Sequence, residues 1–304
     1  MVYGLSTMDY TLISYLHPMA FNFQTFRTRA LTAIVFVIVM LGGLLWNQWS
    51  FLALFAVIHV GCWIEYRSLI AKIDPRYKHI SSIHLYSAIA AGLGFMCWMT
   101  GENYIIADTL LSDIGFRVLL VALTVLVLIK LLKARMPDWK IIGYTIGGLV
   151  YISMSWGLLM NLYNYFEGNI NEKGWLLPML IIATIWINDT MAYLVGSFIG
   201  RTPFSPISPK KTWEGTVGGA ILAVAAVTVA GVYWLELPLL QLLLITITSA
   251  VMGTLGDLLE SKLKRMAGVK DSGSFMPGHG GFLDRFDSLL LAVPYVWLIL
   301  FLFG

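Results

Sequence analysis

Nine long runs of apolar residues dominate this chain and leave it few ways to fold. Each is close to the roughly 20 residues that a helix needs to cross the hydrocarbon core of a bilayer, although the second is short. The runs lie approximately at Ala30–Trp46, Trp49–Ile64, Ile83–Thr100, Phe116–Leu132, Ile141–Tyr163, Trp175–Ile199, Thr216–Trp234, Leu239–Leu258 and Leu289–Phe303. The sequence therefore predicts an all-α integral membrane protein with about nine transmembrane helices.

The composition agrees with this class. Hydrophobic residues make up 58% of the 304 residues and charged residues only 12%, whereas soluble domains are about 25% charged. No block of lysine and arginine resembles a nucleic-acid footprint, so we expect no nucleic-acid partner. The two cysteines, Cys62 and Cys97, lie in apolar runs and are expected to be free thiols.

The distribution of basic residues predicts the orientation. If the N-terminus is cytoplasmic, nine spans place every lysine and arginine on the inner side except Arg117 and Lys173, as the positive-inside rule requires. An error of one span would destroy this separation. The predicted outer segments carry acids instead: Glu102, Asp108, Asp113, Glu167, Glu172 and Glu236.

Three segments follow from this count. Residues 1–29 are expected to form an interfacial or flexible segment, since they lack the basic start of a signal peptide. Residues 30–165 would form the N-terminal transmembrane helices. Residues 166–304 would form the C-terminal transmembrane helices with their cytoplasmic loops, which the polar residues described next assign to catalysis.

One polar stretch, residues 261–288, stands out and reads SKLKRMAGVKDSGSFMPGHGGFLDRFDS. Five bases and three acids are interleaved in it. Glycines flank His279, so the backbone can bend there and approach a ligand closely. Asp284 and Asp287 share a face if a helix has begun by then. Carboxylates for Mg²⁺, bases for phosphates and glycines for close approach together indicate phosphoryl chemistry.

A solvated loop whose bases only set the topology is the simpler interpretation of this stretch. The interleaved acids and the clustered glycines count against it. So does the position of the carboxylates at the ends of apolar runs, where an unpaired charge is costly.

Polar residues upstream of this stretch also favour a functional site over a solvated loop. Asp189 lies inside the sixth run, on one helical face with Tyr193, Gly196 and Gly200. A carboxylate there is a candidate functional residue, with a structural ion pair as the alternative. The two glycines are more typical of helix packing.

Two further groups of polar residues lie at the ends of later runs. Ser208, Lys210 and Lys211 precede Thr212, which could cap the following helix and bring N–H groups to a phosphate. Asp257 and Glu260 lie one turn apart, and we expect Glu260 to be a solvated helix end. Glu65, which ends the second run, is interpreted as a topological marker.

These residues resemble the signature of the CTP:phosphatidate cytidylyltransferases, also called CDP-diacylglycerol synthases. The resemblance is specific and covers the chain from about Ile185 onward, with Arg201 where the family commonly has lysine. The matching positions in the polar stretch are Ser261, Lys264, Arg265, Lys270, Asp271, Gly273, Pro277, His279, Gly280, Gly281, Asp284, Arg285 and Asp287. Upstream, the run from Asn188 to Tyr193, the run from Ser208 to Thr212 with Glu214 and Gly215, and the Gly256-Asp257 pair also match.

The resemblance implies the transfer of a cytidylyl group from CTP to phosphatidic acid, giving CDP-diacylglycerol and pyrophosphate. It implies a bacterial inner membrane location and Mg²⁺ as cofactor, and leaves a second cation and a homodimer open. Asp257, Asp284 and Asp287 would be catalytic residues that bind the metal. Lys264 and Arg265 would be catalytic residues whose positive charges hold the phosphates.

Substrate binding would fall to a second set of residues. It contains Asp189, Ser208, Lys210, Lys211, Lys270, Asp271, His279, Gly280, Gly281 and Arg285. His279 would be either a cover over the triphosphate or part of a plain turn, and Arg285 would alternatively pair with an aspartate.

Two other classes of function stay open. A transporter would suit Asp189 within a span, but it needs polar residues through the membrane depth on several spans, whereas the charge here collects at one face. Another membrane enzyme that uses CTP or an isoprenoid phosphate would need a similar charged face. These residues do not identify the lipid, so this class stays open.

Overall fold

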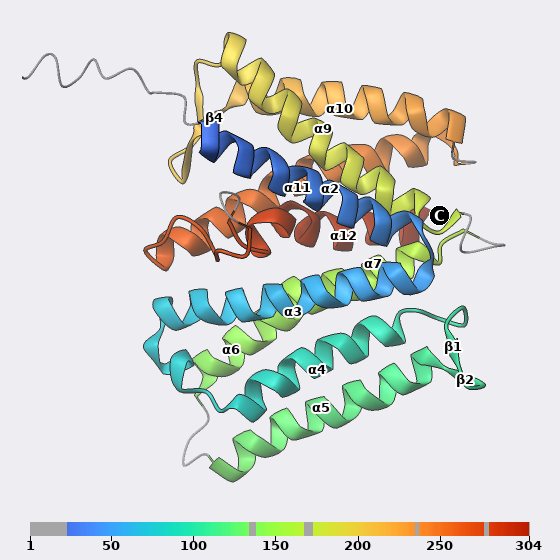
Figure 1. The fold of residues 1–304 in the computed structure, drawn as a ribbon, viewed down its shortest axis with the longest axis vertical. Coiled ribbons are helices and arrows are strands. Elements are labelled where there is room, and N and C mark those ends of the chain that lie inside the picture. The colour runs from blue at the N-terminus through green and yellow to red at the C-terminus, as the bar shows by residue number, and fades with distance from the viewer. Residues whose placement is uncertain (1–22, 134–137, 167–172, 235–236, 277–279, 304) are drawn as a thin grey trace, which may run out of the picture.

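The computed structural model describes residues 23–133, 138–166, 173–234, 237–276 and 280–303 and shows a bundle of long helices (Figure 1). Seven helices in these ranges are long and apolar enough to cross a membrane by length and composition. Two shorter apolar segments, Ala30–Leu45 and Ser82–Trp98, lie on the other two predicted runs. Large apolar side chains such as Ile38, Leu132 and Phe198 are exposed on the outside of the bundle, as expected for a surface that faces lipid. The protein is a multi-pass helical membrane protein.

Every predicted run falls on a helix. The helices are α2 (Phe23–Leu45), α3 (Gln48–Ile73), α4 (Ser82–Trp98), α5 (Leu111–Lys133), α6 (Trp139–Gly148), α7 (Ser155–Tyr163), α9 (Leu176–Ile199), α10 (Trp213–Trp234), α11 (Leu239–Met266) and α12 (Leu283–Phe303). A π-helical segment, η3 (Leu149–Met154), joins α6 to α7, and a 3₁₀ turn, η2 (Pro75–His79), follows α3. The expected N-terminal segment is helical from Phe23, and residues 1–22 lie outside the described ranges.

Several helices, α2 and α5 among them, extend beyond the apolar runs that predicted them, and three of these extensions bear on the candidate site. α3 continues to Ile73, α11 continues to Met266, and α12 begins at Leu283. The extra turns contain charged residues, so a search for apolar runs ends too early. Each of these three extensions carries a carboxylate of the candidate site, namely Glu65, Glu260 or Asp284.

Two short antiparallel hairpins depart from the all-α prediction. β1 (Ile105–Ile106) and β2 (Thr109–Leu110) are joined through Ala107 and Asp108, which both have positive φ, as a tight two-residue turn requires. β3 (Pro203–Ser205) pairs with β4 (Ser208–Thr212) between α9 and α10. The second hairpin carries the lysines that the sequence singles out.

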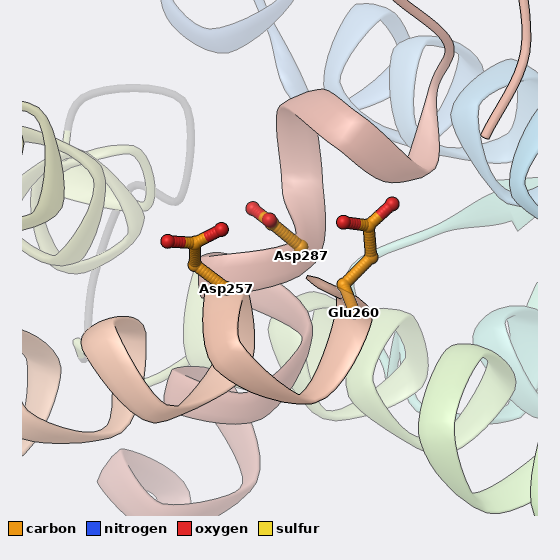
Figure 2. A group of neighbouring side chains, drawn as sticks. All are labelled: Asp257, Glu260 and Asp287. Atoms are coloured by element: carbon orange, nitrogen blue, oxygen red, sulfur yellow. The ribbon is translucent and has the colours of Figure 1, made fainter. Parts of the chain in front are cut away.

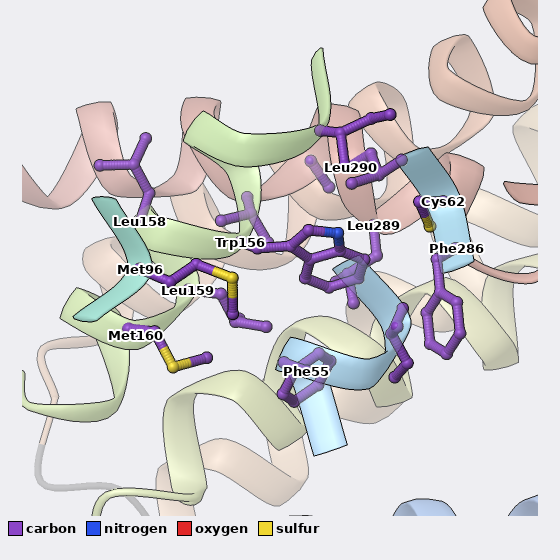
Figure 3. Packing of buried hydrophobic residues seen from close by; sticks show 14 of the residues in the cluster. Phe55, Cys62, Met96, Trp156, Leu158, Leu159, Met160, Phe286, Leu289 and Leu290 are labelled. Carbon is purple, nitrogen blue, oxygen red and sulfur yellow. The ribbon is translucent and has the colours of Figure 1, made fainter. Parts of the chain in front are cut away.

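The core brings the two halves of the chain together. Figure 3 shows Trp156 of α7 packed among Phe55 of α3 and residues of α12. The ring centroids of Trp156 and Phe286 are 5.5 Å apart and those of Trp156 and Phe55 are 5.1 Å apart. Ser155 also donates a hydrogen bond of 2.5 Å to the carbonyl of Leu290. The N-terminal helices thus support α12, which carries two of the predicted site residues. Cys62 and Cys97 are free, as predicted.

Small residues let α9 and α10 pack at close range. A Cβ added to Gly219 would lie 2.5 Å from the backbone nitrogen of Ala192, and one added to Gly196 would lie 3.0 Å from Oγ1 of Thr212. Gly200 also faces Thr212. The predicted helix-packing role is confirmed for Gly196, which approaches Gly215 of α10, whereas Gly200 lies against Thr212 of strand β4.

The two ends of the bundle differ. β4, the end of α11 and the start of α12 lie at one end, whereas β1, β2 and the C-terminus lie at the other (Figure 1). The polar stretch and the lysine-bearing hairpin therefore share one end of the molecule.

We predict that Gly219→Ala destabilises the bundle by about 1–3 kcal/mol, because the added methyl group overpacks the contact with Ala192. Gly143→Ala is the matched control, since no heavy atom lies within 4 Å of a Cβ added to this helical glycine. Thermal unfolding in detergent should show a lower Tm for the first variant only. Equal Tm values would contradict this account of the packing of α9 against α10.

Candidate active site

Three carboxylates from two helices meet at the polar end of the bundle. Asp257 and Glu260 lie one turn apart on α11, and Asp287 lies on α12 (Figure 2). Figure 2 shows Asp287 between the other two. One carboxylate oxygen from each residue lies within 4.8 Å of the others. We call Asp257, Glu260 and Asp287 the carboxylate cluster.

Close packing of α11 against α12 makes this cluster possible. A Cβ added to Gly256 would lie 2.5 Å from the carbonyl oxygen of Asp287, so a larger residue would push the two helices apart. The Gly256-Asp257 pair noted in the sequence thus has a physical reason. The glycine permits the helices to approach, and the aspartate next to it then reaches Asp287.

Glu260 overturns the expectation of a solvated helix end. Its side chain is fully buried. It forms an ion pair with Lys264 one turn later, while its Oε1 atom has no hydrogen-bond partner among the described residues. A buried carboxylate oxygen without a partner is costly. The sequence showed that Glu260 lies one turn after Asp257. It could not show that Glu260 is buried, because burial at a charged helix end depends on how neighbouring helices pack.

Asp284, which the sequence grouped with Asp257 and Asp287, lines the same cavity but is not one of the three carboxylates of the cluster. Its Oδ1 accepts a hydrogen bond of 2.7 Å from Lys264. Its Oδ2 accepts hydrogen bonds from the backbone N–H groups of Ser272 and Gly281, both at 2.8 Å. With these donors Asp284 orders the loop before α12, and Lys264 links it to Glu260.

The hairpin β3–β4 brings a base to the cluster. Lys211 on β4 forms an ion pair with Asp257. Thr212 accepts a hydrogen bond of 3.2 Å from the N–H of Gly215, which confirms the predicted cap of α10. Glu214 accepts from the N–H groups of Arg201 and Thr202, both at 3.1 Å, and so ties the hairpin to the end of α9.

A cavity of about 460 Å³ opens beside the cluster, within the usual range for sites that hold small molecules. Seven predicted residues line it: Asp189, Ser208, Lys210, Lys211, Asp257, Asp284 and Asp287. Asp189 is exposed to this space. A smaller cavity of about 130 Å³ shares Asp189, Asp284 and Asp287 but is otherwise lined largely by apolar residues of α2, α9 and α12.

The other predicted residues lie elsewhere. Lys264 is not among the residues that line the two cavities. It forms ion pairs with Glu260 and Asp284. Arg265, Lys270 and Asp271 are exposed and do not line either cavity. Arg285 lines the smaller cavity. His279 lies outside the described residues, so its predicted role as a cover stays a prediction.

The two described glycines of this motif make room for carboxylates. Gly280 has a φ of +82°, a conformation that favours glycine, and a Cβ there would lie 2.5 Å from Oδ2 of Asp284. A Cβ on Gly281 would lie 2.2 Å from Oε1 of Glu65. Sequence reasoning assigned these glycines to ligand approach and did not connect them with Glu65.

The cluster fits a hard divalent cation. Its three donors are carboxylate oxygens, which Mg²⁺ and Ca²⁺ prefer, and Oε1 of Glu260 has no other partner among the described residues. Two lysines on different elements, Lys211 and Lys264, form ion pairs with Asp257 and Glu260 of the cluster, and Lys264 also forms an ion pair with Asp284. Such a concentration of negative charge favours a bound cation.

The fold and the site describe a membrane-embedded protein with a cavity suited to phosphates. The sequence pattern of the Cytidylyltransferase family matches residues 27–303, and the chain belongs to this family.

Named relatives agree with this assignment. The chain is 38% identical over 196 residues to a phosphatidate cytidylyltransferase of Bacillus subtilis, covering 63% of this chain and 69% of that protein. It is 30% identical over 281 residues to the protein of the same name from Staphylococcus saprophyticus, covering 90% and 98% of the two chains. A Synechocystis protein of that name is 46% identical over 129 residues, covering 41% of this chain and 43% of its own.

We predict that Lys264→Met lowers the free energy of unfolding by about 3–5 kcal/mol, because it leaves the buried Glu260 without its cation. Adding Glu260→Gln should restore part of the lost stability. Lys262→Met, an exposed position on the same helix, is the control. Thermal unfolding of the four proteins in detergent measures these effects, and a double variant less stable than Lys264→Met would refute the proposed pairing.

Proposed function

We propose that this protein transfers the cytidylyl group of CTP to phosphatidic acid, releasing pyrophosphate and forming CDP-diacylglycerol for phospholipid synthesis. The carboxylate cluster beside a lysine-lined cavity is the observation that carries the proposal. Membership of the Cytidylyltransferase family and the names of the relatives support the reaction and the lipid.

The larger cavity would take the triphosphate of CTP. Ser208, Lys210 and Lys211 line it from the hairpin β3–β4. A lysine near a phosphate offsets negative charge, and a hydroxyl can donate a hydrogen bond to a phosphate oxygen. Lys211 also contacts Asp257, which lies in the cluster. The hairpin would thus hold the nucleotide phosphates next to the carboxylates.

The smaller cavity would take the lipid phosphate. Phe36 and Met40 of α2 and Trp186 of α9 give it an apolar side, while Asp287 and Asp189 are shared with the larger cavity. A phosphomonoester has a second pKa near 6, so a lipid phosphate oxygen is ionised at neutral pH and can attack the α-phosphorus of CTP without a strong base. The work of the protein is then to bring two anions together in line.

Asp257, Glu260 and Asp287 would hold Mg²⁺. Here Glu260 takes the place that the sequence gave to Asp284, because Oε1 of Glu260 has no hydrogen-bond partner among the described residues, whereas both oxygens of Asp284 accept hydrogen bonds. A bound divalent cation would offset the charge of the two phosphates and of the pyrophosphate that leaves. Lys264 would hold Glu260 and Asp284 at fixed positions.

The finer membrane arrangement is also a proposal. We infer nine spans, a cytoplasmic N-terminus and a location in a bacterial inner membrane. The segregation of bases and the bacterial relatives support it. This orientation places the carboxylate cluster at the cytoplasmic face, where CTP is present. Pairing into a homodimer stays a prediction from the resemblance alone.

Family membership disfavours a transporter. A membrane enzyme that joins CTP to a different lipid phosphate would share the same cluster and cavity. Repeating the assay below with other lipid phosphates in place of phosphatidic acid distinguishes these enzymes.

Asp287→Asn should lower kcat for CDP-diacylglycerol formation by about 100-fold or more, because it removes a carboxylate from the metal site. Purified protein would be assayed in detergent with labelled CTP and phosphatidic acid, with Mg²⁺ and with EDTA. Asp113→Asn, an exposed site outside both cavities, is the control. Full activity in EDTA would exclude the metal, and no product from any lipid phosphate would exclude the reaction.

Alkaline phosphatase fused after the last residue should be active, since nine spans from a cytoplasmic N-terminus leave the C-terminus outside. The same reporter fused after Asp138, which follows the fourth run, should be inactive. Green fluorescent protein at the two positions should give the reverse pattern. An inactive phosphatase at the C-terminus with normal expression would mean that the span count or the orientation is wrong.

A further inference from the structure

Glu65 connects the N-terminal half of the chain to the candidate active site from a distance of more than two hundred residues in sequence. It lies on the polar extension of α3 and is buried. We propose that Glu65 is a positioning residue for cytidylyl transfer, which fixes the start of α12 and thereby the position of Asp287. This inference rests on the proposed function and adds to it a residue outside both cavities.

The contacts of Glu65 converge on the first turn of α12. Its Oε1 accepts a hydrogen bond of 2.9 Å from the N–H of Phe282, and its Oε2 accepts one of 2.9 Å from the N–H of Leu283. The first N–H groups of a helix have no partner within the helix. The carboxylate of Glu65 satisfies the first N–H of α12, at Leu283, and that of Phe282 just before it, and it interacts favourably with the helix dipole. Here the carboxylate comes from a different helix.

The same carboxylate also reaches Asp284 through one hydroxyl group. The Oγ atom of Ser272 lies 2.8 Å from Oε2 of Glu65 and 2.9 Å from Oδ2 of Asp284. Asp284 then contacts Lys264, and Lys264 contacts Glu260 of the cluster. A continuous series of polar contacts thus runs from α3 to the carboxylate cluster.

Two glycines of the polar stretch fit around this carboxylate. Ideal Cβ atoms on Gly273 and Gly281 would lie 2.3 Å and 2.2 Å from Oε1 of Glu65. Any side chain at either position would displace Glu65 or the loop. The loop therefore closes around Glu65, whose side chain is not among those that line either cavity.

These contacts explain how Glu65 would act on the reaction without touching substrate. Asp287 lies one turn after the N–H groups that Glu65 holds. If those groups were released, the first turn of α12 would loosen and Asp287 would lose its fixed distance from Asp257. A displacement of about 1 Å in a reacting constellation can lower the rate about 100-fold.

Glu65→Gln tests the proposal, because an amide keeps the size but replaces one acceptor oxygen by a donor. Amide hydrogen exchange of the full-length protein in detergent should become faster in residues 280–288 and stay unchanged in the remaining helices. With the same protein, kcat/KM for CTP should fall about 10- to 100-fold. Glu65→Asp should recover part of the activity, since it keeps both oxygens. Glu102→Gln, an exposed position, is the control.

A second variant separates positioning from a general loss of folding. Ser272→Ala removes the shared hydroxyl but leaves both backbone contacts of Glu65, so its effect should be smaller. The double variant should be less impaired than the product of the two single effects. A purely structural role would lower the amount of folded protein without changing the KM for CTP.

The proposal fails if Glu65→Gln keeps kcat/KM within twofold of the wild type, or if exchange at the start of α12 is unchanged. It also fails if the activity falls only in proportion to the folded fraction. Wild-type turnover tests the proposed function separately. Should the wild type give no CDP-lipid, binding of labelled CTP to the wild type and to Glu65→Gln replaces kinetics, and equal affinities would then overturn the positioning role.

Discussion

The concentration of negative charge between α11 and α12 is the constraint on which this end of the structure depends. Three carboxylates lie close together, and two of them, Glu260 and Asp287, are buried. Burial of like charges is unfavourable unless cations offset it. Lys211 and Lys264 approach the cluster from different elements, and Lys264 is shared with Asp284. The hairpin β3–β4, the close approach at Gly256 and the loop before α12 all serve to bring these groups together.

Each predicted apolar run falls on a helix of the described residues, because a long hydrophobic segment in a bilayer must satisfy its backbone hydrogen bonds within itself. The runs were not sufficient to predict where the helices end. The last turns of α3 and α11 and the first turn of α12 are polar, and they are helical because tertiary contacts satisfy their charges. Glu65 accepts the N–H groups at the start of α12, and Lys264 reaches both Glu260 and Asp284. The sequence therefore revealed the candidate site as a polar stretch between two apolar runs. In the structure the cluster carboxylates of this region lie on helices α11 and α12.

The individual site residues show the same limit. Asp257 and Asp287 could be assigned because each stands at the edge of an apolar run within a specific motif, and both line the cavity. Glu260 was expected to be solvated but is buried beside Asp257 and Asp287, since spacing along a helix does not say which neighbour a carboxylate meets. Glu65 was missed because its partners, Ser272, Phe282 and Leu283, are remote in sequence. A clue was present in Gly273 and Gly281, whose missing side chains leave the space that Glu65 fills.

Anomalous diffraction from crystals of the wild-type protein grown with Mn²⁺ in place of Mg²⁺ is the most direct test of the central claim, which is that Asp257, Glu260 and Asp287 form the cation site. The account predicts an anomalous peak within coordination distance of oxygens from all three residues, with Asp284 still bound to Lys264. A peak coordinated by Asp284 without Glu260, or no peak at this position at saturating Mn²⁺, would contradict it.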